Sequence, residues 1–202
     1  MHTAARWTVI VPVKPVSSGK SRLGLGEEFA AAVALDTIEA AAGARLVAAL
    51  IVVTPDVVFA RAAERSPGVH AVIEADARGI AAAIDAGTAA AAGGDRAVLL
   101  GDLPALRRDE LDAALGLALD HDRAFVPDTE GTGTTLVTAR AGLRLVTAFG
   151  EDSARRHREL GLHRLDLPVD SGLRRDIDRP EQLLDAAVLG LGPRTAALRS
   201  AR

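Results

Sequence analysis

Short β-branched apolar runs alternate with longer Ala-rich segments along the first half of this chain, and that alternation constrains the fold most. Strands are expected at residues 7–13, 46–53, 69–73 and 97–100, with helices at 27–42, 56–64 and 80–92 between them. Runs this apolar are typical of strands that are covered on both faces. Regular alternation of strand and helix builds a mostly parallel sheet through right-handed crossovers. We therefore predict an α/β fold with helices on both faces of the sheet.

The second half of the chain is less regular but continues the same pattern. Helices are expected at 108–119, 153–160 and 180–189, and strands at 124–127, 134–139 and 164–167. No repeat or low-complexity linker separates the halves, and 202 residues suit one domain. We predict a single domain over residues 1–191 and a frayed C-terminal tail over residues 192–202.

Charge and composition exclude several classes of function. The formal net charge of -3 argues against a surface that coats nucleic acid. Cysteine is absent, which excludes disulfides, thiolate zinc sites and a cysteine nucleophile. Residues 1–13 lack the features of a signal peptide, and no apolar stretch approaches the roughly 20 residues of a membrane span. We expect a cytoplasmic protein with a small-molecule partner, no nucleic acid and no membrane.

The loop after the first expected strand holds both lysines of the chain. Lys14 and Lys20 lie there together with Arg22, whereas 22 of the 24 basic residues are arginine. Lysine is a compact point charge that suits phosphate, and the Gly and Ser residues of the loop offer backbone donors. The Walker spacing is not present, because the first glycine of that motif is missing. The loop predicts a triphosphate contact; the alternative is a solvated basic turn.

Three carboxylates follow strand-like segments. Asp102 comes after the run at 97–100, and Asp176 and Asp178 share one face of an extended stretch. Side chains of this type at the carboxyl ends of strands can hold a divalent cation against phosphate. Three carboxylates that converge repel by about 4 kcal/mol for each pair some 4 Å apart, so convergence requires a cation, and magnesium is expected. Taken singly, each is more often a helix cap or a surface charge, and Asp178 is a natural N-cap.

Three further stretches have a binding and a structural interpretation. The turn at 128–135 carries two glycines among hydroxyl residues, which suits a phosphate or carboxylate, or else a simple hairpin turn. Gly150 and Ser153 mark a helix start whose free backbone N–H groups favour an anion, although capping explains them equally well. Gly79 leaves room for a base or ribose, or serves as a cap. His157 lies among arginines on an expected exposed helix, and no histidine is given a role.

Taken in order, these motifs resemble one enzyme family. The stretches are Val11-Pro12-Val13-Lys14, Gly19-Lys20-Ser21-Arg22-Leu23, Gly101-Asp102-Leu103-Pro104, 128–134, Phe149-Gly150-Glu151-Asp152-Ser153 and Asp176-Ile177-Asp178-Arg179-Pro180-Glu181. The chain is similar over about residues 8–190 to the phospholactate or phosphoenolpyruvate guanylyltransferases of deazaflavin coenzyme (F-420) biosynthesis.

The resemblance implies a fold, a cofactor and site residues. The fold would be a Rossmann-like nucleotidyltransferase sheet related to glycosyltransferase type A domains, with GTP as donor. The implied roles are magnesium binding by Asp102, Asp176 and Asp178; acceptor binding by Thr134, Gly150 and Ser153; nucleotide binding by Pro12, Lys14, Lys20, Arg22 and Gly79; and catalysis by Lys14, Lys20 and Asp102. Relatives often have Gly-Leu-Asn-Ala-Ala where this chain has Gly79-Ile80-Ala81-Ala82-Ala83, so the contacts to the base are not assigned.

The expected reaction is attack of an acceptor phosphate oxygen on the α-phosphorus of GTP. A phosphate is already ionised near neutral pH, its second pKa being about 6, so no general base is required. The composition, rich in Ala and Arg, is typical of a GC-rich genome and favours the acceptor of actinobacterial relatives, phosphoenolpyruvate, over 2-phospho-L-lactate or 3-phosphoglycerate. Molybdenum-cofactor guanylyltransferases and sugar-phosphate uridylyltransferases usually open with a glycine loop that is missing here. A non-catalytic nucleotide-binding module is the alternative of another class.

Overall fold

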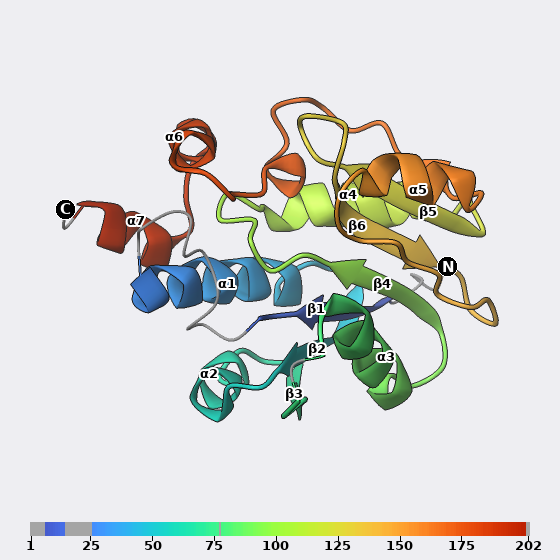
Figure 1. Cartoon of the computed structure of the whole chain (residues 1–202), viewed down its shortest axis with the longest axis horizontal. Coiled ribbons are helices and arrows are strands. Elements are labelled where there is room, and N and C mark those ends of the chain that lie inside the picture. The colour runs from blue at the N-terminus through green and yellow to red at the C-terminus, as the bar shows by residue number, and fades with distance from the viewer. Residues whose placement is uncertain (1–6, 15–25, 77, 201–202) are drawn as a thin grey trace.

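A computed structural model describes residues 7–14, 26–76 and 78–200 of the chain. Its centre is a seven-stranded sheet with the order β3-β2-β1-β4-β6-β5-β7 (Figure 1). The strands are β1 (Trp7–Pro12), β2 (Val47–Thr54), β3 (Val69–Ile73), β4 (Asp95–Leu99), β5 (Arg123–Pro127), β6 (Thr134–Ala139) and β7 (His163–Arg164). The predicted α/β class, with a mostly parallel mixed sheet, is therefore confirmed.

The direction of the strands places several loops at one edge of the sheet. β1 pairs in parallel with β2 and β4, and β2 pairs in parallel with β3. β6 is antiparallel to both β4 and β5, while β7 is parallel to β5. The loops that follow β1 and β4 consequently leave the sheet at the same edge, where ligands of open α/β sheets collect.

Helices cover both faces of the sheet, as predicted. They are α1 (Gly26–Ala42), α2 (Val57–Ala63), α3 (Ile80–Ala90), α4 (Arg108–Ala118), α5 (Ser153–Glu159), α6 (Pro180–Leu189) and α7 (Pro193–Ser200), and a 3-10 turn, η3, spans Gly172–Arg174. Buried residues of α1, α2 and α4 share one cluster with the sheet. Residues of α3 pack on the other face, and α5 contributes to a smaller cluster there.

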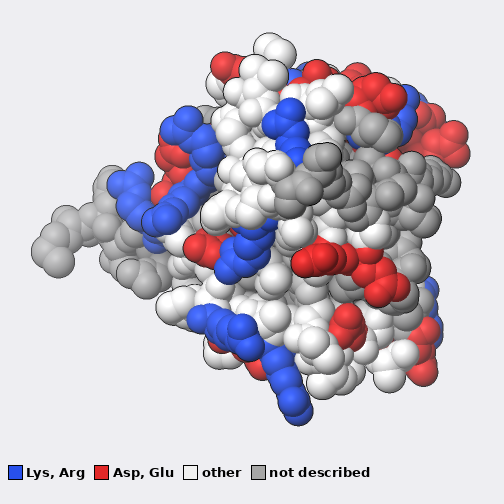
Figure 2. Space-filling view, turned by 90° about the vertical axis from the view of Figure 1, so that its left-hand side faces the viewer, with Lys and Arg blue, Asp and Glu red and all other residues white. Residues whose placement is uncertain are grey.

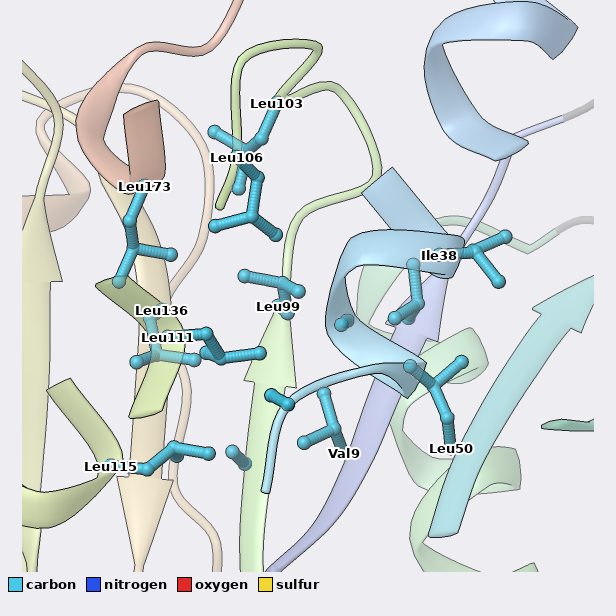
Figure 3. Packing of buried hydrophobic residues seen from close by; sticks show 14 of the residues in the cluster. Val9, Ile38, Leu50, Leu99, Leu103, Leu106, Leu111, Leu115, Leu136 and Leu173 are labelled. Atoms are coloured by element: carbon cyan, nitrogen blue, oxygen red, sulfur yellow. The ribbon is translucent and has the colours of Figure 1, made fainter. Parts of the chain in front are cut away.

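The alternation of side chains along β1 explains why helices pack on both faces of the sheet. Val9 and Val11 belong to the cluster under α1, and Ile10 between them belongs to the cluster under α3. Figure 3 shows part of the cluster under α1, with Val9 of β1, Leu99 of β4 and Ile38 of α1. All three side chains are fully buried. Because β-branched residues on both faces meet apolar partners, the sequence run at 7–13 has no polar face.

The C-terminal segment differs from the prediction. The expected frayed tail at 192–202 is wrong for its described part, because Pro193–Ser200 forms α7 against α1. The buried carboxylate of Asp36 accepts hydrogen bonds from the backbone N–H groups of Arg194 at 3.2 Å and Thr195 at 2.8 Å. The Arg194 side chain also reaches Glu39 at 2.6 Å. A side chain from α1 thus satisfies the free N–H groups at the start of α7, which local sequence does not indicate.

Most other elements differ from the expected boundaries by one or two residues, and the segment between α5 and α6 differs more. The strand expected at 164–167 shrinks to β7, and η3 was not predicted. Asp178 is not the N-cap of α6, which is Arg179; instead the side-chain oxygen of Gln182 accepts hydrogen bonds from the N–H groups of both residues. Within the described ranges, no helix has the length and apolar character that crossing a membrane requires.

Candidate active site

A cavity of about 880 Å³ opens at the edge of the sheet where β1 and β4 end. Every predicted site residue that the structure describes lines it: Pro12, Lys14, Gly79, Asp102, Thr134, Gly150, Ser153, Asp176 and Asp178. Lys20 and Arg22 lie outside the described residues. The volume falls in the range of small-molecule sites, roughly 300–1,000 Å³. Residues predicted from six separate stretches of sequence therefore share one cavity.

Lys14 and Gly79 both line this cavity and each follows from the local backbone. Lys14 is exposed just beyond β1, and the N–H of Val13 still donates to the Val53 carbonyl at 2.8 Å, which continues the pairing with β2 up to that point. Gly79 precedes α3 with a φ of 104°, a backbone region that only glycine adopts without strain. The structure thus explains a glycine at 79 by conformation, besides the close approach expected from the sequence.

The three carboxylates predicted to bind metal lie near one another. The N–H of Ile177, between Asp176 and Asp178, donates to the Asp102 carbonyl at 3.2 Å. Burial raises the pKa of Asp176 to about 8, and the neighbouring charges of Asp102, Asp128 and Asp178 add to that shift. Without a cation, Asp176 therefore holds a proton at neutral pH.

Among the residues that the structure describes, the acidic group spaced closely enough to share a cation differs from the predicted set. Side-chain oxygens of Asp128, Glu130 and Asp176 lie within 4.8 Å of one another. Asp128 is buried and Glu130 is exposed, and neither was predicted as a ligand. Their position directly after β5 was the available signal, since it places them at a strand end like the others.

This donor set fits a hard divalent cation. Carboxylate oxygens are the ligands that Mg²⁺ and Ca²⁺ prefer, and three neighbouring carboxylates add to burial in raising the pKa of Asp176. The residues present therefore suit the magnesium that the family resemblance implies.

Asp128 also fixes the turn that connects β5 and β6. Its carboxylate accepts hydrogen bonds from the N–H groups of Thr132 at 3.0 Å and Gly133 at 2.7 Å. A Cβ atom on Gly133 would lie 2.3 Å from the Asp128 Oδ2 atom, so the close approach requires glycine. These backbone N–H groups donate to Asp128 and not to a ligand in the cavity. The expectation that they bind a phosphate or carboxylate is therefore wrong for them, and the structure supports the alternative of a simple hairpin turn.

A buried arginine ties this turn to the segment that leads to Asp176. The Arg174 guanidinium donates to the carbonyls of Pro127 at 3.2 Å, Asp128 at 2.9 Å and Leu167 at 3.0 Å. In return, the N–H and hydroxyl of Thr129 both donate to the Arg174 carbonyl. The hydrogen bonds in both directions hold Asp128 next to Asp176, a role that the sequence did not indicate.

The residues expected to seat the acceptor lie on the opposite side from α1. Thr134 opens β6, Ser153 opens α5, and Gly150 is exposed in the loop before α5. The N–H of Ser153 donates to the Gly150 carbonyl at 3.1 Å, and that of Ala154 donates to Thr132 at 3.0 Å. These two N–H groups at the start of α5 were expected to be free to bind an anion. Both already donate hydrogen bonds within the protein, so that expectation is wrong for them.

His157 differs most from its prediction. It was placed on an exposed helix face, but the ring is fully buried between Phe125 and Phe149. Its Nδ1 atom lies 2.9 Å from the Thr134 hydroxyl, and Nε2 accepts a hydrogen bond of 2.8 Å from the N–H of Ala148. Burial, helped by the charge of Arg156 and opposed by a hydrogen bond with the Ser153 backbone, lowers the pKa of His157 to about 4.

One face of the molecule carries side chains of both charges. Figure 2 shows acidic and basic side chains interspersed on the face that it displays, without one continuous basic field.

Solved structures that share this architecture include proteins named as nucleotidyl transferases. A nucleotidyl transferase from Methanothermobacter thermautotrophicus matches with a TM-score of 0.62 at 18% identity, covering 98% of this chain and 99% of that chain. The 4-diphosphocytidyl-2C-methyl-D-erythritol synthase of Anaerococcus prevotii matches with a TM-score of 0.63 at 9% identity, covering 92% and 96%. The fold is thus that of the nucleotidyltransferases, as predicted.

Sequence comparison narrows this class to one family. The model of the CofC-like guanylyl transferases matches residues 7–197. The chain is 42% identical to the phosphoenolpyruvate guanylyltransferase of Streptomyces coelicolor, covering 96% of this chain and 95% of that protein. It is also 42% identical to the enzyme of the same name from Salinispora arenicola, covering 95% and 92%. This protein belongs to the CofC-like guanylyl transferase family.

Proposed function

We propose that this protein transfers GMP from GTP to the phosphate of phosphoenolpyruvate. A phosphate oxygen of the acceptor attacks the α-phosphorus of GTP in line, the bond to the β-phosphate breaks, and pyrophosphate leaves. The product is enolpyruvyl-diphospho-guanosine, the type of intermediate expected in coenzyme F-420 biosynthesis. The observation that carries the proposal is the single cavity lined by all nine described residues of the predicted site, in a chain that shares 42% identity with relatives named for this reaction.

Holding two polyanions together is the main task of such a site. GTP and phosphoenolpyruvate repel each other, and the acceptor phosphate is already ionised, so the reaction needs positioning and charge compensation rather than a base. Lys14 lies exposed at the cavity and, with Lys20 and Arg22, supplies positive charge for the triphosphate. Pro12 and Gly79 bring backbone close to the nucleotide.

The acidic side chains of the cavity would bind the metal ion. Asp102, Asp176 and Asp178 would hold Mg²⁺, and Asp128 and Glu130 lie close enough to Asp176 to contribute. The ion, when bound, offsets the charge of the phosphates that meet at the reacting phosphorus. Thr134, Gly150 and Ser153 bind the acceptor on the side of β6 and α5.

Product formation with separate acceptors tests the proposal. Purified protein is given GTP, Mg²⁺ and one of phosphoenolpyruvate, 2-phospho-L-lactate or 3-phosphoglycerate, and products are identified by mass spectrometry alongside pyrophosphate release. We expect the guanosine diphosphate ester of phosphoenolpyruvate. A product with 2-phospho-L-lactate only would reassign the acceptor. Binding of GTP with no pyrophosphate release for any acceptor would instead favour the non-catalytic nucleotide-binding module.

A further inference from the structure

We propose that His157 is a positioning residue that directs the Thr134 hydroxyl to donate a hydrogen bond into the cavity, toward the acceptor. This inference rests on the proposed function, because it takes Thr134 as a contact of phosphoenolpyruvate. The sequence pattern predicts an exposed position for His157 and indicates no role for it.

The hydrogen bonds of the ring determine where its proton lies. The N–H of Ala148 approaches Nε2 at 2.8 Å and can only donate, so Nε2 must be the unprotonated nitrogen of the ring. In a neutral imidazole the proton then sits on Nδ1. Nδ1 lies 2.9 Å from Thr134 Oγ1, so its proton is donated toward the hydroxyl oxygen, besides the hydrogen bond of the ring with the Ser153 backbone.

That direction decides what the hydroxyl can do. A threonine hydroxyl whose oxygen accepts from an imidazole still has its own proton to donate. Thr134 lines the cavity, and an anionic acceptor offers only oxygen atoms that accept. In the opposite tautomer Nδ1 would accept the hydrogen bond of the Thr134 hydroxyl, and that proton would not be available to the ligand. His157 therefore converts Thr134 from a group that could either donate or accept into a donor toward the ligand.

The His157 ring also contacts the loop before α5, which carries Gly150, another residue expected to bind the acceptor. Through Nε2 it holds the backbone at Ala148, two residues before Gly150. Phe149, which lines the cavity, packs edge-on against the ring with centroids 5.3 Å apart. One buried side chain of α5 thus contacts both β6 and the loop that carries Gly150.

The burial of His157 keeps this arrangement constant. The ring is fully buried, and its pKa of about 4 leaves it neutral under ordinary assay conditions. A charged imidazole would present a proton on both nitrogens and lose its acceptor for Ala148. The tautomer is therefore fixed by the protein rather than by the solution.

Steady-state kinetics with two ring replacements test the inference. His157→Phe keeps an aromatic ring and removes both nitrogens, whereas His157→Asn keeps an N–H donor near the place of Nδ1. We expect His157→Phe to raise KM for phosphoenolpyruvate by about tenfold or more, the effect of one hydrogen bond to a charged group, with little change in KM for GTP. His157→Asn should give an intermediate value. His163→Phe, on an exposed histidine away from the cavity, is the matched control and should leave both constants unchanged.

A double-mutant cycle separates positioning from general packing. The part of the His157→Phe effect that acts through the Thr134 hydroxyl is absent in a Thr134→Val background, so the double variant should raise KM for phosphoenolpyruvate by clearly less than the product of the two single effects. Effects that multiply, or equal increases in both KM values, would overturn the inference.

Nitrogen-15 NMR of the unmodified protein gives an independent answer that does not depend on variants folding. We expect the His157 signal of a neutral ring protonated at Nδ1; a proton on Nε2 would overturn the inference. If the wild-type protein makes no product from GTP and phosphoenolpyruvate, the proposed function fails. The NMR result would still decide whether Nδ1 carries the proton of the ring.

Discussion

The N–H of Ile177 donates to the carbonyl of Asp102 at 3.2 Å, which joins the loop after β4 to the segment before α6. The Ile177 side chain is fully buried with Phe29 of α1. Because side chains alternate along an extended segment, its neighbours Asp176 and Asp178 turn the other way, and both line the cavity. A core contact therefore positions two carboxylates of the candidate site.

Replacement of Asp102 by asparagine should suppress turnover while leaving the fold intact. Asp102→Asn keeps the shape and the backbone carbonyl that Ile177 contacts, but removes a charge next to Asp176. We expect pyrophosphate release to fall by at least about 100-fold, the scale of losing a charged group from such a site. Asp120→Asn, on an exposed turn outside the cavity, is the control. Parent-level turnover by a folded Asp102→Asn protein would remove Asp102 from the proposed machinery.

Magnesium should stabilise the protein more at high pH than at low pH. The folded-state pKa of Asp176, about 8, exceeds its ordinary value of 3.8, so its contribution to stability is present at low pH and is lost as pH rises through the folded value. At about pH 6 a cation must displace the Asp176 proton, whereas at about pH 8.5 the carboxylate is already ionised. The rise in Tm on adding Mg²⁺ should therefore be larger at the higher pH.

Thermal unfolding with Mg²⁺, with a chelator and with NaCl of matched ionic strength measures this difference. Asp176→Asn cannot titrate at this position, so its magnesium response should vary much less with pH. Equal shifts in Tm at both pH values in the wild-type protein would contradict the assignment of Asp176 as a metal ligand.

Elements with strong local patterns were predictable from the sequence. Residues 69–73, 134–139 and 180–189 have the same boundaries in the structure, because β-branched runs and an N-terminal proline encode them locally. Asp102, Asp176 and Asp178 line one cavity, as expected, although Asp176 and Asp178 follow η3 rather than the strand-like stretch expected there.

The features that were not predicted depend on partners distant in the chain. α7 forms against Asp36, and the position of Asp128 depends on Arg174. His157 stands among three arginines, a pattern typical of an exposed helix face, and only the packing of α5 against Phe125 buries it. No local pattern reports such long-range contacts.

Replacement of Gly133 by alanine should disturb the acidic group through Asp128. The added Cβ would meet the Asp128 Oδ2 atom at 2.3 Å, so the carboxylate must move and lose its hydrogen bonds to the turn. We expect a loss of about 1–3 kcal/mol in the free energy of unfolding, together with weaker stabilisation by Mg²⁺. Gly116→Ala in α4 has only an ordinary contact at 4.0 Å and should be neutral or stabilising. Urea denaturation compares the two; equal effects would contradict the steric argument.

Arg174→Met should destabilise the protein by roughly 3 kcal/mol or more. The substitution retains an apolar chain but leaves the carbonyls of Pro127, Asp128 and Leu167 without their donor in a buried region. Arg199→Met, on an exposed position of α7, controls for loss of a positive charge. Urea midpoints that agree between the two variants would show that the Arg174 hydrogen bonds contribute little to stability.

Acid should weaken the wild-type fold partly through His157. Its folded pKa of about 4 is below the ordinary value of 6.5, so the unfolded chain takes up the proton first. This contribution to stability is complete above about pH 6.5 and is lost as pH falls toward 4. A shift of this size corresponds to at most about 3 kcal/mol. His157→Phe has no such proton to bind, so its free energy of unfolding should fall less between about pH 7 and pH 4.5 than that of the wild type. The difference between the free energies of unfolding of the wild type and His157→Phe, measured in urea at each pH, removes the contribution of the other titrating groups. A difference that does not change with pH would show that His157 is not buried as a neutral ring.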